Sequence, residues 1–338
     1  MLETIWFVIW GLLWAGYFLL DGFDLGLGAL MPFIAKDESE RKAIYHAVGP
    51  FWDGNEVWLI AAGGLTFAVF PGAYATMFSA LYSALMLLLF ALIIRGAALG
   101  LRGETESRWA KRAWDRMFAL GSILSALLFG VVFANIFQGI PIDAEGVYQG
   151  SLLTLLNPYG LLGGALFFAF FLVHGCLWLV MKSNGELRER AKGLAPKLWL
   201  ALLALALVFL GSSAVFTEIW SQYLNHLALL IIPLSAVVSL LAVMVFMRRD
   251  AWDNAWIASA LFVASAFFFG WIGIYPALLP SSLDSAYHVT IHNSASSPLT
   301  LKIMLGVALV FIPLVIVYQA LVYSLFKGKA GKGEHGYY

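Results

Sequence analysis

Two pairs of carboxyl groups with the same spacing could carry proton chemistry. Asp21 and Asp24 are three residues apart, and so are Asp53 and Glu56. In an α-helix this spacing places both side chains of a pair on one face. Carboxyl groups so placed can hold and relay protons, because burial and neighbouring charges change how readily they ionise. A structural reading stays open for Asp53, because a carboxylate near a helix N-terminus is also stabilised by the helix dipole.

The chain around these acids has the composition of a helical membrane protein. It has 338 residues, 62% hydrophobic and 12% charged, whereas soluble domains have about 45–50% and about 25%. Its 20 basic and 20 acidic residues give a formal net charge of zero. This composition excludes a soluble enzyme, a disordered protein and a nucleic-acid binder. A single cysteine excludes a disulfide framework and a cysteine-ligated metal cluster.

The apolar stretches predict an all-α polytopic membrane protein with nine transmembrane helices. A bilayer core about 30 Å thick needs about 20 apolar residues per helix. The expected spans are 5–33, 52–71, 74–100, 117–138, 158–181, 198–217, 227–247, 254–279 and 300–326. Pro71-Gly72 can form a tight turn between the second and third spans, and 101–116 and 182–197 are expected loops. The first span has no preceding basic residue and no cleavage signal, so we expect it to remain in the mature protein.

Basic residues lie in the loops that a nine-span topology places on one side of the membrane. All but two of the 20 Lys and Arg residues are in the odd-numbered loops or the tail, 327–338. The exceptions are Arg95, inside the third span, and Lys302, at the start of the last. By the positive-inside rule the tail is cytoplasmic and the N-terminus is outside. One helix more or fewer would scatter the basic loops over both sides.

This topology brings the charged residues of the first four spans together at their cytoplasmic end. The residues are Asp21, Asp24, Asp53, Glu56, Arg95 and Asp115. Charged groups within a span are costly, so each is a functional candidate. For Asp53 and Glu56 we favour proton uptake or release on the cytoplasmic side. For Asp24, Arg95 and Asp115 a purely structural ion-pair network is the alternative, and Arg95 could also extend to the lipid headgroups.

The histidines predict no redox centre and no metal site in this chain. A haem in a helical bundle needs an axial His, Met or Cys, and only His174 lies well inside an expected span. We interpret His174 as a hydrogen-bonded core residue. His288 and His292 are four residues apart in an expected outer loop and would bind a metal only with further ligands.

Glycines four residues apart favour close contacts between helices. The pairs are Gly22 with Gly26, Gly96 with Gly100, and Gly160 with Gly164. Small side chains let two membrane helices approach closely. We therefore expect packing, rather than ligand binding, to explain nearly all of the 32 glycines.

Distinctive motifs follow one another in order from about residue 5 to residue 326. The most specific is GPFWDGNEVWL at 49–59. The others are DGFDLG at 21–26, Trp114-Asp115, QGIP at 138–141, LNPYGL at 156–161, Tyr275-Pro276, PSS at 280–282 and SPLTL at 297–301. On these motifs the sequence resembles subunit II of the cytochrome bd-type quinol oxidases, including the cyanide-insensitive branch.

The resemblance implies a fold and a partner. The fold would have two four-helix bundles, at about 1–138 and 158–279, and a ninth, peripheral helix at 300–326. A related subunit I would form a pseudo-symmetric heterodimer with this chain and hold haem b, haem d and the quinol site. The complex would oxidise quinol, reduce oxygen to water and build proton motive force in the bacterial cytoplasmic (inner) membrane. No cofactor is expected to bind this chain directly, while a structural quinone and small accessory subunits stay open.

The resemblance also implies roles for individual residues. Asp53 would be the entry of a proton path into subunit I that also contains Glu56 and Asp21. Some family members have Gln at the position of Glu56, so its role would be accessory. Asp24, Arg95 and Asp115 would form one charged cluster that supports the haem-bearing partner. An oxygen route or the subunit interface would involve Trp58, Trp52 and Asn55.

Two other classes of protein compete with this reading. A proton-coupled secondary transporter typically has its sites near the midplane of the bilayer, on broken helices, whereas here the acids gather at one membrane face. An assembly or scaffold protein would need the acids only for complex formation. The motifs favour the oxidase subunit over both.

Overall fold

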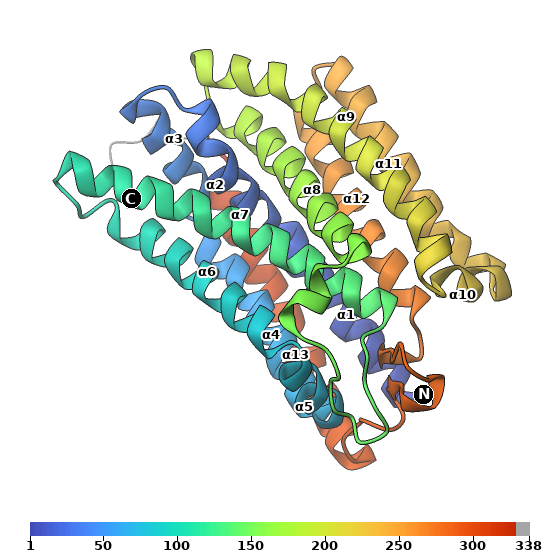
Figure 1. Cartoon of the computed structure of the whole chain (residues 1–338). Helices are drawn as coiled ribbons and strands as arrows, with labels where there is room; N and C mark the ends of the chain where they lie inside the picture. Colours follow the sequence, from blue (N-terminus) through green and yellow to red (C-terminus); the bar gives the residue numbers. More distant parts are fainter. Residues whose placement is uncertain (329–338) are drawn as a thin grey trace.

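The apolar stretches fold into long α-helices that pack side by side (Figure 1). The computed structural model describes residues 1–328, so the predicted tail lies outside the described residues from residue 329 onward. The helices are α1 (Leu2–Leu20), α2 (Gly22–Ile34), α3 (Glu38–Val48), α4 (Trp52–Val69), α5 (Pro71–Ala80), α6 (Tyr82–Leu101), α7 (Arg108–Gln138), α8 (Pro158–Lys182), α9 (Gly185–Phe216), α10 (Ile219–Asn225), α11 (Ile231–Arg248), α12 (Trp252–Gly273) and α13 (Pro298–Leu325). The connections contain the 3₁₀ turns Leu152–Leu156, Leu227–Leu230 and Ser285–Tyr287 and the strands β1 (Ala277–Leu279) and β2 (Val289–Thr290).

Within residues 1–328, eight helical segments are long and apolar enough to cross a membrane. The helices α1 and α2 count as one segment. The helix continues through Asp21, because the Asp21 N–H donates to the Tyr17 carbonyl oxygen at 2.8 Å and the Leu25 N–H donates to the Asp21 carbonyl oxygen at 3.0 Å. The second expected span corresponds to α4, which is not among the eight. Its first two turns carry three polar side chains, which make it less apolar than the others.

The third expected span, 74–100, is wrong as a single helix. It is divided into α5 and α6 at Leu81, whose backbone (φ −98°, ψ 11°) leaves the helical conformation that Asp21 keeps, although hydrogen bonds at 2.9 and 2.8 Å still span this turn. The predicted Pro-Gly tight turn is also absent at this position, because Phe70 alone connects α4 to α5 and Pro71 begins α5. Proline is well suited to the first helical position, where its missing N–H would have no intrahelical partner.

The expected loops at 101–116 and 182–197 are largely helical, as is part of the first loop, which forms α3. In α9 the cause is an amphipathic first half. Leu187, Ala191 and Ala195 are buried at helical spacing. The charged residues of the same turns pair within the helix, for example Arg190 with Glu186 at 3.4 Å. Charged sequence at the membrane surface therefore forms helix here rather than loop.

The eighth expected span, 254–279, ends earlier than expected. The helix α12 stops at Gly273, and the following residues form β1, which pairs with β2 in an antiparallel arrangement. A parallel bridge between Ile140 and Ser281 joins this sheet region to the connection after α7. Backbone hydrogen bonds between distant segments therefore close this end of the molecule.

The helices α2 and α8 touch at their backbones. A Cβ atom on Gly26 would lie 2.6 Å from the carbonyl carbon of Phe171 and 3.2 Å from the Cα atom of Gly175. A Cβ atom on Gly175 would lie 2.7 Å from the backbone nitrogen of Leu27. No side chain fits at either position without separating the helices, so the two glycines set the spacing of the core.

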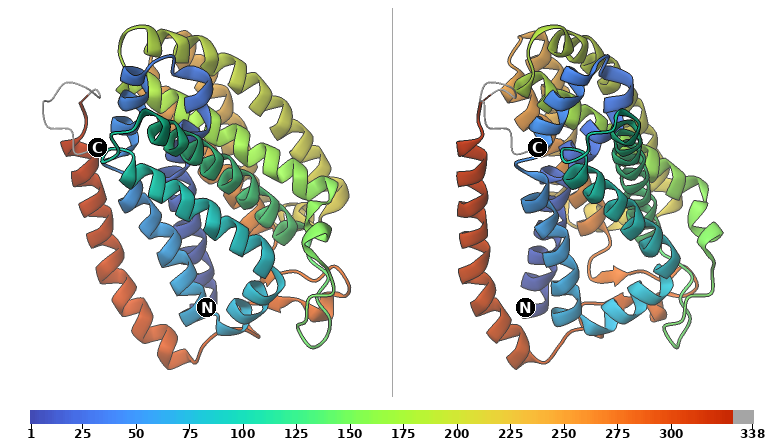
Figure 2. Two further views of the ribbon diagram at one scale, coloured as in Figure 1. Left: turned by 60° about the vertical axis from the view of Figure 1, so that its left-hand side comes forward. Right: turned by 90° about the vertical axis from the view of Figure 1, so that its left-hand side faces the viewer.

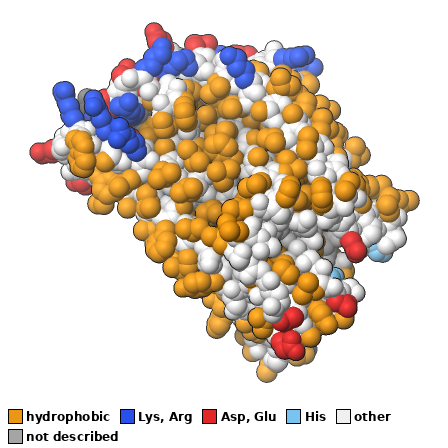
Figure 3. All heavy atoms as spheres, viewed as in Figure 1, with side chains coloured by type: hydrophobic (Ala, Val, Ile, Leu, Met, Phe, Trp, Pro, Cys, Tyr) orange, Lys and Arg blue, Asp and Glu red, His pale blue; other side chains and the backbone are white. Residues whose placement is uncertain are grey.

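Charge separates the two ends of the molecule, and α13 lies at its edge. On the face drawn in Figure 3, Lys and Arg gather at the upper end, beside α3 and the first turn of α9. In Figure 2 α13 runs along the outside of the other helices. Only 6% of its most apolar 18 residues are buried, against 78% for α8. Contacts of α13 with the rest of the chain are therefore few, and each is informative.

Candidate functional site

The centre of the candidate site is a buried arginine with two acidic partners. Arg95, on α6, is fully buried. Its Nη1 donates to Asp21 Oδ2 at 2.8 Å and its Nη2 to Asp21 Oδ1 at 2.5 Å, which is a bidentate pair. Nη1 also donates to Glu56 Oε1 at 3.0 Å. We call Asp21, Asp24, Glu56 and Arg95 the acid–arginine cluster.

Asp24 completes this cluster without a cation of its own. Its Oδ2 accepts from Asn55 Nδ2 at 2.7 Å and lies 4.0 Å from Arg95 Nη2. Its Oδ1 is buried and has no hydrogen-bond partner in residues 1–328. The cluster thus contains three carboxyl groups and one guanidinium. An excess of carboxyl groups over cations gives coupled sites that can gain and lose protons.

The remaining acid of the two pairs, Asp53, lies at the surface. Asp53 is exposed on α4, and its carboxylate forms no hydrogen bond or ion pair with the part of the chain that the structure describes. Glu56, one turn further along α4, is 24% exposed and contacts Arg95. Asp21 and Asp24 are fully buried behind it. Carboxyl groups therefore follow one another from the surface to the core.

The expected cluster of Asp24, Arg95 and Asp115 is wrong in one member. Asp115 Oδ1 accepts from Arg102 Nε at 2.6 Å, and its Oδ2 lies 3.8 Å from Arg41 Nε. Arg102 follows the end of α6 and is seven residues from Arg95, about 10 Å along a helix. Asp115, near the start of α7, is at the level of Arg102 and pairs with it.

This second cluster ties α3 to α6 and α7. Arg102 Nη2 donates to both oxygens of Glu38 at 3.0 Å, and its guanidinium lies 4.6 Å from the ring centre of Tyr45. Burial opposes the charge of Arg102, but the hydrogen bond and charge of Asp115, together with Glu38, raise the pKa of its guanidinium. Burial, and then the charge of Asp115, raise the pKa of the Tyr45 hydroxyl. Arg102 is therefore a permanent cation that holds α3 in place.

We expect Arg102→Gln to loosen α3 while leaving the acid–arginine cluster intact. Hydrogen bonds to charged groups contribute about 1.5–3 kcal/mol each, so local opening of α3 should become at least tenfold more frequent. Hydrogen exchange of the amides of 38–48 in the purified complex measures this change. Arg108→Gln, at an exposed position of the following helix, is the matched control. Unchanged exchange in Arg102→Gln would show that the ion pairs do not hold α3.

The tryptophans of the 49–59 block pack against the neighbouring helices. Trp58 is 9% exposed, and a Cβ atom on Gly16 would lie 3.3 Å from its ring. Trp52 lies beside Gly96 on α6 in the same way, at 3.4 Å. Both indole N–H groups are buried and have no partner in residues 1–328. Asn55 differs from the expected interface role, because it is fully buried within this chain, among polar groups.

Sequence reasoning missed two residues of α13 that reach the site. Gln319 Nε2 donates to Asn55 Oδ1 at 2.7 Å, and the Tyr323 hydroxyl donates to the same oxygen at 3.1 Å. Gln319 is 7% exposed on a helix whose other residues are mostly exposed. An amide within an expected span was the available signal, because polar side chains in membrane helices usually find a partner there.

His174, the histidine inside a span, is engaged by the core. Its Nδ1 lies 2.6 Å from Ser259 Oγ and its Nε2 lies 3.0 Å from the Leu19 carbonyl oxygen. Its ring stacks on Trp256 with centroids 5.0 Å apart. Both ring nitrogens thus have protein partners, so His174 does not suit a haem ligand. In residues 1–328 no three His, Cys, Asp or Glu side chains are grouped as metal ligands.

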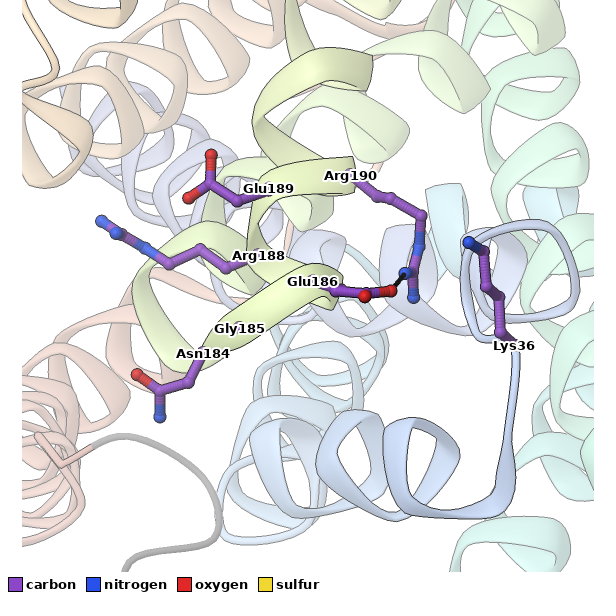
Figure 4. Close-up of a pocket in the computed structure, with 7 residues that line it drawn as sticks. All are labelled: Lys36, Asn184, Gly185, Glu186, Arg188, Glu189 and Arg190. Atoms are coloured by element: carbon purple, nitrogen blue, oxygen red, sulfur yellow. Dashed lines mark hydrogen bonds and ion pairs between the residues drawn. The ribbon is translucent and has the colours of Figure 1, made fainter.

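Hollows also lie outside the acid–arginine cluster, and two of them border predicted or charged regions. One, of about 630 Å³, is at the charged end between the loop after α2 and the start of α9 (Figure 4), and its lining residues are Lys36, Asn184, Gly185, Glu186, Arg188, Glu189 and Arg190. Arg190 pairs there with Glu186 and Glu40. The other is an apolar cavity of about 200 Å³ between α1, α4, α5, α6 and α7, lined in part by Trp14, Thr66 and Met77. Neither contains a predicted proton-path residue.

Comparisons with known proteins agree over nearly the whole chain. A family model described as cytochrome bd terminal oxidase subunit II matches residues 2–326. The cytochrome bd ubiquinol oxidase subunit 2 of Bacillus subtilis is 33% identical, with 98% of each chain covered. The cytochrome bd-I ubiquinol oxidase subunit 2 of Escherichia coli is 32% identical, over 99% of this chain and 96% of that one.

A solved structure, the bd oxidase of Geobacillus thermodenitrificans, contains a chain of the same fold. The TM-score is 0.78 at 18% identity, with 96% of this chain and 98% of that chain covered. The fold, the apolar helices and the sequence matches together make this an integral membrane protein. The chain belongs to the cytochrome bd terminal oxidase subunit II family.

Proposed function

We propose that this chain, as subunit II of a quinol oxidase complex, passes protons from the cytoplasm toward a haem-bearing subunit I. The observation that carries the proposal is the series of carboxyl groups from the surface to the core. Asp53 is exposed, Glu56 is partly exposed and bound to Arg95, and Asp21 is buried. In this series Asp53 takes up the proton, and Glu56 has an accessory role beside the permanent charge of Arg95.

The same proposal includes a topology of nine spans. The helix α4 is the second span, and α5 with α6 forms the third. The N-terminus is outside, and the basic loops and the tail face the cytoplasm of a bacterial cell, in its inner membrane. The first four spans and the next four form two bundles, and α13 is the peripheral ninth helix. The gathering of Lys and Arg at one end of the molecule supports this orientation (Figure 3).

Subunit I would dock on the face of α4 that carries Asp53. Val57, Ile60 and Phe67 are exposed on this helix at 45%, 72% and 62%. Exposing the Asp53 carboxylate to lipid, beside these apolar residues, would cost free energy. At an interface with subunit I, the carboxylate would instead contact polar groups of the proton path. Subunit I would carry haem b, haem d and the sites for quinol and oxygen, and Trp58 and Trp52 would border an oxygen route. Small accessory subunits would bind elsewhere on the apolar surface.

The apolar cavity beside α1 suits the ring of a structural quinone. Trp14 lines the cavity, and its indole N–H has no hydrogen-bond partner in residues 1–328. An indole N–H is a donor only, so it matches the carbonyl oxygen of a quinone. Such a quinone would fill space between α1 and α7 and would take no part in proton transfer.

Asp53→Asn tests the proton path. General acid–base groups typically contribute about 10²–10⁴-fold to a rate, and water can partly replace a surface carboxylate, so we expect quinol-dependent oxygen uptake per haem to fall about tenfold. The haem content of the purified complex should stay at the level of the parent. Glu106→Gln, an exposed acid in the loop after α6, is the control. Full turnover per haem in Asp53→Asn would remove Asp53 from the path, and a lower yield of complex with full turnover would indicate a scaffold role.

A further inference from the structure

The helix α13 meets the acid–arginine cluster through one amide. Gln319 and Tyr323 are one turn apart on α13, and both donate to Asn55 Oδ1. Asn55 Nδ2 in turn donates to Asp24 Oδ2 at 2.7 Å and to the Leu20 carbonyl oxygen at 2.9 Å. A continuous chain of hydrogen bonds therefore leads from the peripheral helix to a buried carboxyl group.

These contacts fix which way the Asn55 amide points. Its oxygen accepts two hydrogen bonds and its NH₂ group donates two, so every hydrogen-bonding site of the amide is used. If the amide rotated by half a turn, its NH₂ group would face the two donors of α13 and its oxygen would face Asp24 and a carbonyl. The contacts with Asp24 and the Leu20 carbonyl would then be repulsive, because these oxygens and the amide oxygen only accept. Gln319 and Tyr323 can adapt to either orientation, because an amide and a hydroxyl group each contain both a donor and an acceptor. Asp24 and the Leu20 carbonyl therefore set the orientation of the amide, and the two hydrogen bonds from α13 hold the amide in this place.

The surroundings are shaped for this contact. A Cβ atom on Gly54 would lie 3.3 Å from Gln319 Oε1. A side chain at position 54 would therefore crowd the glutamine, and the glycine leaves room for it. The ring of Phe51 lies 4.6 Å from that of Tyr323, between centroids. Beyond it, the Lys182 ammonium group donates to the carbonyl oxygen of Phe326, at the end of α13. The inner end of a mostly exposed helix is therefore held at several points around Asn55.

Charged and titratable groups face Asp24 from several elements. Asp21 and Arg95 lie beside it, and Glu56 reaches the same guanidinium from α4. Tyr323 approaches from α13. The groups on the other packed helices are engaged elsewhere: His174 of α8 with Ser259 and Leu19, Asp115 of α7 with Arg102 and Arg41, and Arg190 of α9 with Glu40 and Glu186. Among neutral groups, only the Asn55 amide donates to Asp24 in residues 1–328.

We propose that Gln319 and Tyr323 are positioning residues for proton transfer, which hold the Asn55 amide on Asp24 and so set the pH range in which this carboxyl group exchanges its proton. The proposal rests on the proposed proton-supply function. A hydrogen bond donated to a carboxylate favours its charged form. When the amide is free to turn away, Asp24 keeps its proton to a higher pH, and the pH profile of turnover moves with it.

The test uses Gln319→Leu with Tyr323→Phe in the complete oxidase. Quinol-dependent oxygen uptake per haem is measured across pH, together with the haem content. We expect full haem content and a pH profile displaced upward by about one unit, which corresponds to about tenfold in the proton equilibrium. Tyr318→Phe is the matched control, because Tyr318 is the neighbour of Gln319 and is 63% exposed.

Each outcome decides the role. A displaced profile with full haem content supports positioning, and an unchanged profile with full haem content overturns it. If the double variant loses haem, Tyr323→Phe alone, which removes a single hydroxyl group, is measured in the same way, and an unchanged profile there also overturns the proposal. Since Asp53→Asn is measured separately, an unchanged profile together with slow turnover in Asp53→Asn rejects the positioning role and leaves the proton path standing.

Discussion

Replacing Arg95 by leucine is expected to prevent assembly of the oxidase. Arg95 is the sole cation in contact with Asp21 and Glu56 in residues 1–328, and both the arginine and Asp21 are fully buried. Removing one partner of a buried ion pair costs about 3–5 kcal/mol, because the other charge is left without compensation. A loss of this size is comparable to the whole stability of many domains. The yield of haem-bearing complex from membranes should fall at least tenfold.

A compensating variant distinguishes loss of charge balance from loss of shape. Asp21→Leu and Glu56→Gln, added to Arg95→Leu, remove the two carboxylates that accept hydrogen bonds from the arginine. Apolar replacement of a whole buried ion pair is often neutral or stabilising, so much of the yield should return. The recovered complex should nevertheless turn over slowly, since the proposed proton path has lost two of its members. A parental yield in Arg95→Leu alone would contradict the expected effect.

The sequence predicts the charged site in outline, and the differences have local causes. The three-residue spacing placed Asp21 and Asp24 on one side, and both do face the region of Arg95. Asp115 was assigned to the wrong arginine, because spacing along the chain does not tell which of two arginines, seven residues apart on one helix, lies at its level. The amide of Gln319 inside an expected span signals a buried polar partner, but the sequence does not identify Asn55 as that partner, since 264 residues separate the two.

The fold was predictable where hydropathy alone decides it. The long apolar stretches are helices, whereas the predicted loops before α7 and α9 contain helical turns. The first turns of α9 carry charge on one face and bury apolar residues such as Leu187 and Ala191 on the other. A prediction from the mean hydropathy of a segment assigns such helices to loops, because their stability comes from the apolar face that they bury and not from their average composition. The division at Leu81, inside an apolar stretch, leaves no signal in hydropathy.

Among the Gly→Ala changes in residues 1–328, Gly26→Ala should be the most damaging. The added carbon would overlap the carbonyl group of Phe171 on α8, and neither backbone can move without displacing the other. Overpacking in a core costs about 1–3 kcal/mol, and occasionally more. Here the obstacle is backbone rather than a flexible side chain, so we expect the upper part of that range. The fraction of complex that keeps its haem spectrum after brief heating should fall, with a lower midpoint temperature.

Gly211→Ala is the matched control for this change. Gly211 lies within α9 and is exposed, and an added Cβ would have no contact within 4 Å beyond its chain neighbours and the adjacent backbone of its own helix. Alanine is favoured over glycine in a helix by about 1 kcal/mol, so this variant should be as heat-stable as the parent or slightly more so. Equal midpoints for the two variants would mean that α2 and α8 can separate freely. Opposite shifts would mean that the backbone contact at Gly26 sets their distance. Asp24 lies two residues earlier on α2 and 4.0 Å from Arg95, so the packing of α2 against α8 also supports the position of this carboxyl group in the acid–arginine cluster.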